Sequence, residues 1–452
     1  MHKNLTLLRA LVIAGLVAPS LASATDGYFS NGYGMKSNGM GGAAVAVALE
    51  PFGGAVNPGA MAFLGNEWQA GLAWFSPDRY ASRSGSGMAG MDGYVDSGSK
   101  NFFMPEFGMN WKYRPDVALG ITVYGNGGMN TDYAGGQISN QSACTNFRGG
   151  SPVGPYNLLC GNDNLGVDLM QLMIAPYVAW EFAKGHSVGI APTIAYQRFA
   201  AEGLQMFDNP MFSNAPGSVT NNGHSDAWGF GARVGYMGQL TDYLSVGIAY
   251  STKMNMGNFD DYKGLFAEEG GFDIPSNFTV GFALRPTRQW LLALDYERIF
   301  YDDAASVSNQ LANIYACLPP QMGGQGLRDN CLGGSNGAGF GWENINVWKF
   351  GVQYQLDDKW TFRAGYNRSE NPVTPANVTF NIIAPGVVEN QFTLGTTYAI
   401  DKQSAITGTF MYADENSVTG TSLFAGFLQN PAVTETIGMK QYLLGVAYSR
   451  SF

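Results

Sequence analysis

The sequence predicts an all-β fold, a 14-stranded antiparallel transmembrane β-barrel with an N-terminal segment inside its lumen. Three observations carry this prediction. From Trp68 to Phe452, apolar residues alternate with small or polar ones at a period of two, as in strands with lipid on one side and a wet lumen on the other. The connections between these stretches alternate between short and long. Beyond residue 24 no apolar run approaches the roughly 20 residues of a spanning helix, so closing the sheet is the remaining way to satisfy the backbone in hydrocarbon.

The composition favours one large domain. The chain has 452 residues, a net charge of −10, 13% charged residues and 61 glycines. No charged or Pro/Ser-rich linker divides it, and single barrels can be long. The acidic balance argues against a nucleic-acid partner.

The first 24 residues have the features of a signal peptide. Lys3 and Arg9 precede the apolar run 10–17, and residues 22–24, Ala-Ser-Ala, offer a small-residue cleavage site. We therefore expect residues 1–24 to be removed and the product to leave the cytoplasm.

Residues 25–65 do not alternate like the rest of the chain. Glycines crowd positions 27–42, a small-residue stretch at 43–49 could be a short helix, and Asn57 and Pro58 follow. A disordered leader is the alternative, but the apolar content favours a segment that packs against the rest of the protein. We expect residues 66–452 to form the barrel, so the segment would pack against the inner side of the barrel wall.

The last strand shows the barrel pattern most clearly. Tyr442, Leu444 and Val446 share one face, while Gly445 and Ala447 lie on the other. The same alternation predicts strands over 68–74, 103–113, 117–123, 170–182, 188–196, 228–236, 244–250, 278–284, 290–296, 348–354, 360–366, 392–398, 406–412 and 442–452.

The connections between these strands are of two kinds. Short turns are expected at 114–116, 184–185, 241–242, 285–288, 357–359 and 401–402. Long loops are expected near 81–101, 131–167, 200–224, 255–275, 301–345, 369–389 and 413–440. Short periplasmic turns and long outer loops are the asymmetry of outer-membrane barrels.

The third strand is interrupted by Gly125, Asn126, Gly127 and Gly128. Glycines inside a strand weaken pairing, so the interruption predicts a bulge or bend.

Four cysteines form two local groups in long loops. The simplest pairing joins Cys144 to Cys160 and Cys317 to Cys331, each closing a loop. The other two pairings stay open. A zinc site is the rival interpretation, which the three histidines and the lack of CxxC spacing disfavour, so we expect no metal.

The face opposite the apolar one carries charges that would point into the lumen: Glu106, Lys112, Glu181, Arg233, Asp295, Glu297, Lys349 and Arg363. They predict either a salt-bridged interior that supports the inner segment, which we favour, or a site where Arg233, Lys349 or Arg363 receives a substrate carboxylate.

A catalytic relay is not expected. His224, Ser225 and Asp226 are adjacent, and neighbours on an extended chain point to opposite sides. No nucleophile elbow or phosphate loop is present, so the sequence predicts no catalytic residue and no enzyme activity.

Several long loops are apolar. The third carries Leu204, Met206, Phe207, Met211 and Phe212, the fourth Leu265 and Phe266, and the seventh Leu423, Phe424, Phe427 and Leu428. Such loops suggest a hydrophobic ligand, a partner protein or loops packed on one another.

The inner segment and the strand count carry a family resemblance. Gly39-Met40-Gly41-Gly42-Ala43, followed by Asn57-Pro58 and about fourteen strands that end at Phe452, resembles the FadL family of outer-membrane transporters for long-chain fatty acids and aromatic hydrocarbons. The resemblance implies an N-terminal hatch, an apolar lumen pocket, and a third-strand kink at Gly125–Gly128 that opens a lateral passage. It also implies an outer capture groove at the third and fourth loops. The family's Asn-Pro-Ala is here Asn-Pro-Gly-Ala, so only Asn57 and Pro58 are carried over with the hatch glycines Gly39, Gly41 and Gly42.

These features predict passive uptake of a hydrophobic molecule across the outer membrane of a Gram-negative cell. The expected partners are the apolar substrate and outer-membrane lipid, and we expect a monomer with no cofactor. A general porin for polar solutes and a surface adhesin or receptor are the alternatives.

Overall fold

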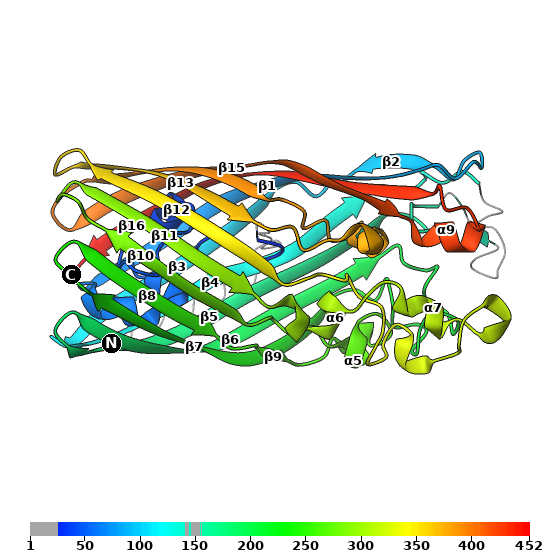
Figure 1. Ribbon diagram of the computed structural model, residues 1–452, viewed down its shortest axis with the longest axis horizontal. Helices are drawn as coiled ribbons and strands as arrows, with labels where there is room; N and C mark the ends of the chain where they lie inside the picture. Colours follow the sequence, from blue (N-terminus) through cyan, green and yellow to red (C-terminus); the bar gives the residue numbers. More distant parts are fainter. Residues whose placement is uncertain (1–25, 141–143, 146–153, 155) are drawn as a thin grey trace.

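The computed structural model describes residues 26–140, 144–145, 154 and 156–452 (Figure 1). The predicted signal peptide, residues 1–24, lies outside the described residues. Within them, antiparallel strands form a long closed barrel, with short turns at one end and long loops at the other.

Fourteen of the sixteen strands make the barrel, and the short strands β2 and β9 pair at its margin. Consecutive barrel strands pair in antiparallel fashion, β2 and β9 pair with β1 and β7, and β1 pairs with β16 to close the ring. The strands are β1 (Glu67–Ser84), β2 (Gly93–Asp96), β3 (Phe102–Arg114), β4 (Val117–Tyr133), β5 (Leu165–Ala183), β6 (His186–Glu202), β7 (Ser225–Gln239), β8 (Leu244–Ser251), β9 (Asn255–Met256), β10 (Asn277–Leu284), β11 (Trp290–Ile299), β12 (Ile345–Gln355), β13 (Trp360–Ser369), β14 (Asn390–Ala399), β15 (Ser404–Thr421) and β16 (Thr434–Ser451).

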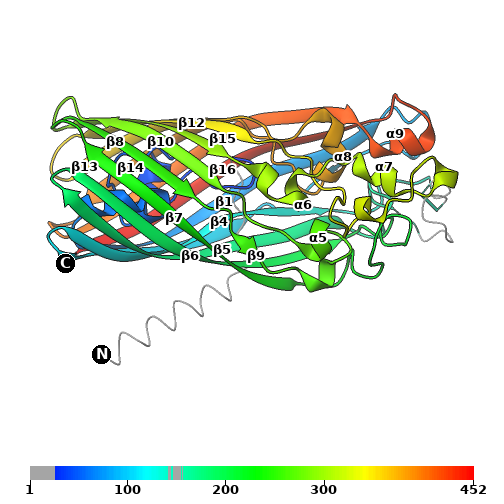
Figure 2. The ribbon, with the colours of Figure 1, turned by 60° about the horizontal axis from the view of Figure 1, so that its bottom comes forward.

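Short helices occupy the N-terminal segment and the long loops, and Figure 2 places α5 to α9 at the loop end. They are α2 (Met35–Asn38), α3 (Gly53–Val56), α5 (Ala267–Gly270), α6 (Ala305–Ser308), α7 (Asn313–Cys317), α8 (Val378–Asn381) and α9 (Leu423–Leu428), with 3-10 helices η1 (Pro58–Phe63), η2 (Asp260–Tyr262), η3 (Tyr301–Asp303), η4 (Pro320–Met322), η5 (Arg328–Asn330) and η6 (Pro375–Asn377). Among the described residues, no helix has the length and apolar character needed to cross a membrane.

The face predicted to meet lipid is the outer face of the barrel. Trp228, Leu394 and Leu444 are 52%, 60% and 56% exposed, although each is large and apolar. A monomer in water would rarely show so wide an apolar surface. At the short-turn end, aromatic rings on neighbouring strands pack in pairs, with centroids 4.7 Å apart for both Trp290–Tyr354 and Trp360–Tyr398. This is the aromatic girdle of a membrane barrel.

At the loop end the strands run further than the sequence pattern predicted. β1 extends to Ser84 and β4 to Tyr133. β15 and β16 stay paired up to Thr421 and Thr434. Their outward positions are polar there, as where the Thr419 and Thr436 hydroxyls meet at 2.8 Å. Beyond the membrane both faces are wet, so the hydrophobic alternation fades while the ladder continues.

The N-terminal segment, residues 26–65, lies inside the barrel toward the short turns (blue in Figure 1). The short helix considered for 43–49 is wrong, because these residues form turns and irregular chain. The backbone N–H groups of Ala44 and Val45 donate to the Asp295 carboxylate at 2.7 and 2.9 Å, and the Val45 carbonyl accepts from Asn57 at 2.7 Å. In a helix these backbone N–H and C=O groups would hydrogen-bond to one another, but here they hydrogen-bond to side chains instead.

Candidate functional site

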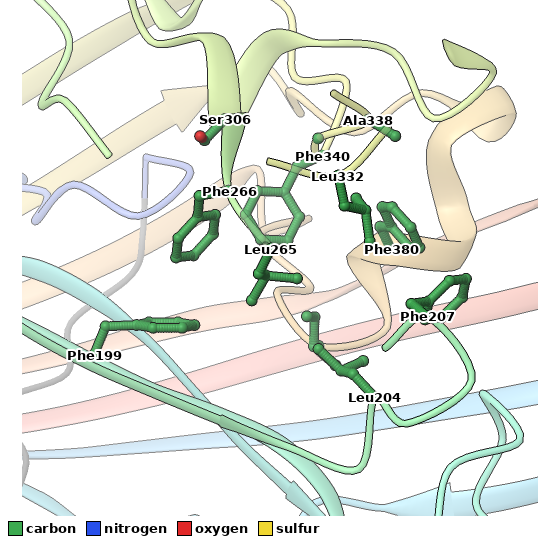
Figure 3. Close-up of a pocket in the computed structure, with 12 residues that line it drawn as sticks. Phe199, Leu204, Phe207, Leu265, Phe266, Ser306, Leu332, Ala338, Phe340 and Phe380 are labelled. Carbon is green, nitrogen blue, oxygen red and sulfur yellow. The ribbon is translucent and has the colours of Figure 1, made fainter. Parts of the chain in front are cut away.

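A small apolar cavity lies among the long loops (Figure 3). It holds about 30 Å³, and a water needs about 10–15 Å³ by this measure, so an aromatic ring enters only if side chains part. The one hydroxyl in its lining, on Ser306, donates to the Gly271 carbonyl at 2.5 Å. The lining consists of Phe199, Leu204, Phe207, Leu265, Phe266, Ser306, Leu332, Ala338, Gly339, Phe340, Phe380 and Ile383.

The apolar loop residues named from the sequence meet at this place. Leu204, Phe207, Leu265 and Phe266 line the cavity, while Met206, Met211 and Phe212 pack in the same cluster. Most of these side chains are buried, and Met211 and Leu265 are half-buried. The loops therefore pack on one another and enclose an apolar space, which combines two of the interpretations of their composition.

Two disulfides tie the long loops. Cys144 is joined to Cys160, and Cys317 to Cys331, with Cα atoms 5.2 and 4.8 Å apart. Among the described residues, no cluster of side chains could hold a metal ion. His224, which stood beside Ser225 and Asp226 in the sequence, instead contacts Asp168 at 2.9 Å and Arg198 at 3.0 Å.

A series of neighbouring aromatic rings, three pairs tilted and the last pair stacked, leads from the cavity toward the barrel wall. We call Phe199, Phe266, Phe272, Tyr28 and Phe29 the aromatic column. Successive ring centroids lie 4.7, 4.9, 6.2 and 5.1 Å apart. The column begins on β6, passes through the fourth loop, and ends on the N-terminal segment.

The column ends at a gap in the barrel ladder. β3 pairs with β4 only from Phe107–Val123 to the turn, whereas β4 stays paired with β5 as far as Tyr133. The β4–β5 register shifts between Gly125 and Gly127, so Asn126 is the extra residue of a bulge. The predicted interruption at Gly125–Gly128 thus lies where two neighbouring strands separate.

The N-terminal segment covers this gap. Phe29 forms an antiparallel bridge with Gly127, and the Ser30 N–H donates to the Asn126 carbonyl at 3.0 Å. Tyr33 adds a hydrogen bond from its hydroxyl to the Asn126 side chain at 2.8 Å. Backbone groups that β3 leaves unpaired on β4 find their partners in the segment.

The glycines named for the hatch fit the segment against the wall. Gly42 brings the segment against itself, since its φ is +85° and a Cβ would stand 1.8 Å from the Asn31 carbonyl oxygen. The other two glycines face the wall. At Gly41 φ is +66°, and its N–H donates to the Thr393 hydroxyl at 2.9 Å. A Cβ on Gly39 would stand 2.9 Å from Gly395 on β14. No other residue type allows this approach of two backbones.

Asn57 and Pro58 form the second anchor of the segment. The Asn57 amide donates to Val45 and to Tyr236 on β7 at 2.7 and 2.9 Å, and its oxygen caps η1 by accepting from Gly59 at 3.0 Å. Pro58 occupies the first turn of η1, where no N–H is needed.

The three lumen cations considered as substrate ligands are engaged at the short-turn half. Lys349 contacts Glu297 at 2.6 Å and Asp26 at 3.6 Å. Arg233 donates to the Val56 carbonyl of the segment at 3.1 Å, and Arg363 donates to Gln353 and Thr397 within the wall. Burial raises the pKa of Asp26 to about 6, although Lys349 opposes the shift. Lys349 and Arg233 thus contact the inner segment, in line with the interpretation we favoured, whereas the printed partners of Arg363 lie in the wall.

Sequence reasoning missed two buried arginines on β1, Arg79 and Arg83, which are 5% and 2% exposed. Arg83 forms an ion pair with Glu435 at 2.6 Å. Both were overlooked because the first strand was expected to end at residue 74, whereas β1 runs to Ser84. The positions 75, 77, 79, 81 and 83 continue the inward face of β1 and could have revealed them.

A closed barrel with an apolar outer face, a lumen filled by its own N-terminal segment and an apolar cavity under its long loops defines an outer-membrane channel. A family model described as "Outer membrane protein transport protein (OMPP1/FadL/TodX)" matches residues 155–452, and the chain belongs to this family. The resemblance found in the sequence and the predicted outer-membrane location are confirmed.

Solved structures share the fold. The chain is similar to the toluene transporter TodX of Pseudomonas putida, with 18% identity, a TM-score of 0.64, and coverage of 95% of this chain and 100% of that one. It is also similar to the toluene transporter TbuX of Ralstonia pickettii, with 18% identity, a TM-score of 0.58, and coverage of 93% of this chain and 99% of that one. A FadL homologue of Pseudomonas aeruginosa shares 12% identity with a TM-score of 0.64, and the match covers 94% of this chain and 100% of that one. No curated protein sequence matches the chain.

Proposed function

We propose that this protein is a passive channel for small hydrophobic molecules and not an enzyme, and that it works as a monomer without a cofactor. The observation that carries the proposal is the aromatic column, which joins the apolar loop cavity to the gap between β3 and β4. TodX and TbuX are toluene transporters, which supports an apolar solute here.

In this proposal the loop residues from Leu204 to Phe212, with Leu265 and Phe266, capture the solute. It then follows the column and leaves sideways through the gap at Gly125–Gly128 into the membrane. An apolar solute is stabilised by about 0.8 kcal/mol per methylene when it stays out of water. Passage sideways into the membrane is therefore favoured in free energy over release into the aqueous periplasm. Residues 25–65 act as the hatch, and Phe29 and Ser30 must leave β4 for the exit to open.

A general porin for polar solutes fits the lumen less well. The described N-terminal segment fills the short-turn half, and its glycines touch the wall backbone. The surface-receptor alternative has no specific observation in its favour.

A reversible cross-link tests the exit. Phe29 and Gly127 are bridge partners, and partners in an antiparallel ladder have Cα atoms about 4.5–5.5 Å apart, within disulfide reach. In a strain that lacks other uptake routes, the double variant Phe29→Cys/Gly127→Cys should take up labelled toluene only after reduction.

Wild type with and without reductant controls for the two native disulfides, and each single cysteine variant controls for the lost side chain. Uptake by the oxidised double variant at the wild-type rate would refute the sideways exit. Uptake of sugars in preference to toluene by the wild type would instead favour the porin.

A further inference from the structure

A second, more polar cavity lies inside the fork where β3 and β4 separate. The two strands pair as far as Phe107–Val123, and the next residue on each strand, Glu106 and Tyr124, lines this cavity. We call it the fork pocket; it lies between residues 30–38 of the N-terminal segment and the inner side of the wall. It holds about 30 Å³, and one water needs about 10–15 Å³ by this measure, so a small polar group has room there.

Three polar side chains of the fork pocket are only partly hydrogen-bonded. Asn31 Nδ2, Asn38 Oδ1 and Glu106 Oε1 are buried atoms without a hydrogen-bond partner among the described residues. Asn31 and Asn38 are 3% and 7% exposed, and Glu106 is half-buried. An unpaired buried polar group costs about 1–3 kcal/mol, so three of them in one place call for a partner from outside the chain.

Two glycines leave space beside these oxygens. A Cβ on Gly32 would stand 3.2 Å from Asn38 Oδ1, and a Cβ on Gly71 of β1 would stand 2.7 Å from Glu106 Oε1. Neither glycine has a φ in the left-handed region, so backbone conformation does not require glycine at these positions. A side chain at either position would instead crowd the oxygen that is left without a partner.

The fork pocket lies at the end of the path proposed for the solute. It is lined by Ser30, whose N–H donates to the Asn126 carbonyl and helps to cover the gap. The rings of Tyr33 and Tyr124, with centroids 4.6 Å apart, form its aromatic side. Phe29, the last ring of the aromatic column, precedes Ser30 in the chain. A solute that arrives at the gap therefore has aromatic rings and unpaired polar atoms next to it.

The unpaired atoms are of two kinds. Asn31 offers an N–H donor, whereas Asn38 and Glu106 offer oxygens. A hydroxyl group both donates and accepts, so one hydroxyl can pair with both kinds. A hydrocarbon can pair with neither, an ammonium group brings donors only, and a carboxylate brings acceptors only.

We propose that Asn31, Asn38 and Glu106 form a recognition site for the hydroxyl group of a small apolar alcohol or phenol. The inference rests on the proposed function, and it makes molecules with one hydroxyl group the preferred substrates within the apolar class. A site that hydrogen-bonds a hydroxyl rejects the analogue without it, because the buried polar groups of the site are then left unpaired.

The test compares 2-naphthol with naphthalene, which has the same rings and no hydroxyl. Equilibrium dialysis against the full-length protein in detergent at pH 7 measures both affinities, with protein-free detergent as the blank. Asn38→Leu keeps the size of the side chain and removes its oxygen, so the ratio of 2-naphthol affinity to naphthalene affinity should fall about threefold to tenfold. Glu106→Met should lower this ratio about tenfold to a hundredfold, because a carboxylate oxygen is the stronger acceptor.

Asn277→Leu is the matched control. Asn277 lies on β10, which pairs with neither β3 nor β4, and is 2% exposed. Its Oδ1 also has no hydrogen-bond partner in the described part of the chain. The same substitution there removes an unpaired amide oxygen away from the fork pocket, so the affinity ratio should stay within about twofold of wild type.

An affinity ratio that changes in neither Asn38→Leu nor Glu106→Met overturns the site and leaves the fork pocket to water alone. An equal loss of affinity for both compounds overturns it too. If Asn38→Leu does not fold, Glu106→Met decides: a fall in the ratio supports the site, and an unchanged ratio overturns it. The proposed channel stands in each of these cases if the wild type takes up naphthalene. A wild type that takes up neither compound overturns the channel itself.

Discussion

The two halves of the lumen are stabilised in different ways. In the short-turn half, the N-terminal segment is held by named polar contacts, such as Lys349 with Glu297 and the backbone of Ala44 and Val45 with Asp295. In the loop half, Phe199, Phe266 and their neighbours are held by apolar packing around a small cavity. Polar contacts have one geometry and define one position, whereas apolar packing tolerates rearrangement. The N-terminal segment is therefore held in one defined position, whereas the side chains around the loop cavity can rearrange.

The largest expected effect comes from removing the cation at the centre of the plug. Lys349→Gln leaves Asp26 and Glu297 buried without their cation, which should cost about 3–5 kcal/mol of unfolding free energy. Arg363→Gln is the matched control, because within the described part of the chain Arg363 hydrogen-bonds to the neutral side chains of Gln353 and Thr397, and its loss should cost about 1–3 kcal/mol. Urea unfolding in detergent measures both, and equal losses would contradict a charge-held plug.

A methyl group at Gly42 should release the segment without harming the barrel. The positive φ and the contact with the Asn31 carbonyl together should cost about 2–5 kcal/mol. We expect Gly42→Ala to raise the leak of small sugars in liposome-swelling assays. Gly65→Ala, where an added Cβ meets nothing within 4 Å, should leak no more than wild type. An unchanged leak in Gly42→Ala would show that the plug does not depend on this contact.

In the loop half, a smaller side chain should change selectivity more than stability. Phe266→Leu keeps the cavity apolar and enlarges it, at a cost of about 1–2 kcal/mol. The uptake of naphthalene relative to toluene should rise. Phe410→Leu, a matched change on the exposed outer face, should leave the ratio unchanged. A ratio that moves in neither variant would place the size limit elsewhere.

The smallest expected effect is a pH dependence of the plug. The pKa of Asp26 is raised from 3.8 to about 6, so the seated segment binds a proton more tightly than the released one. This stabilisation is fully present below pH 3.8 and is lost as the pH rises through about 6. Opening should therefore be about tenfold more frequent at pH 7 than at pH 5. Hydrogen exchange of residues 26–65 measures it, and Asp26→Asn should remove the pH dependence.

Much of the fold could be predicted from residue types alone. Trp228, Leu394 and Leu444 had to face lipid because their strands alternate at period two, and the short turns followed from the gaps between strands. The predicted ends of β1 and β15 were too early, because an outward Thr or Ser above the membrane carries no hydrophobic signal. The cavity could not be predicted, since its lining comes from loops far apart in the chain.

By itself, the sequence determined the barrel, its membrane-facing side and the position of the bulge in β4, because a period-two pattern and a run of glycines act through neighbouring residues. Only the tertiary structure decided that Lys349 supports the plug, that Phe29 covers the gap, and that Arg83 meets the Glu435 carboxylate. Whether a buried charge is paired depends on residues hundreds of positions away, and closing the barrel is what brings them together.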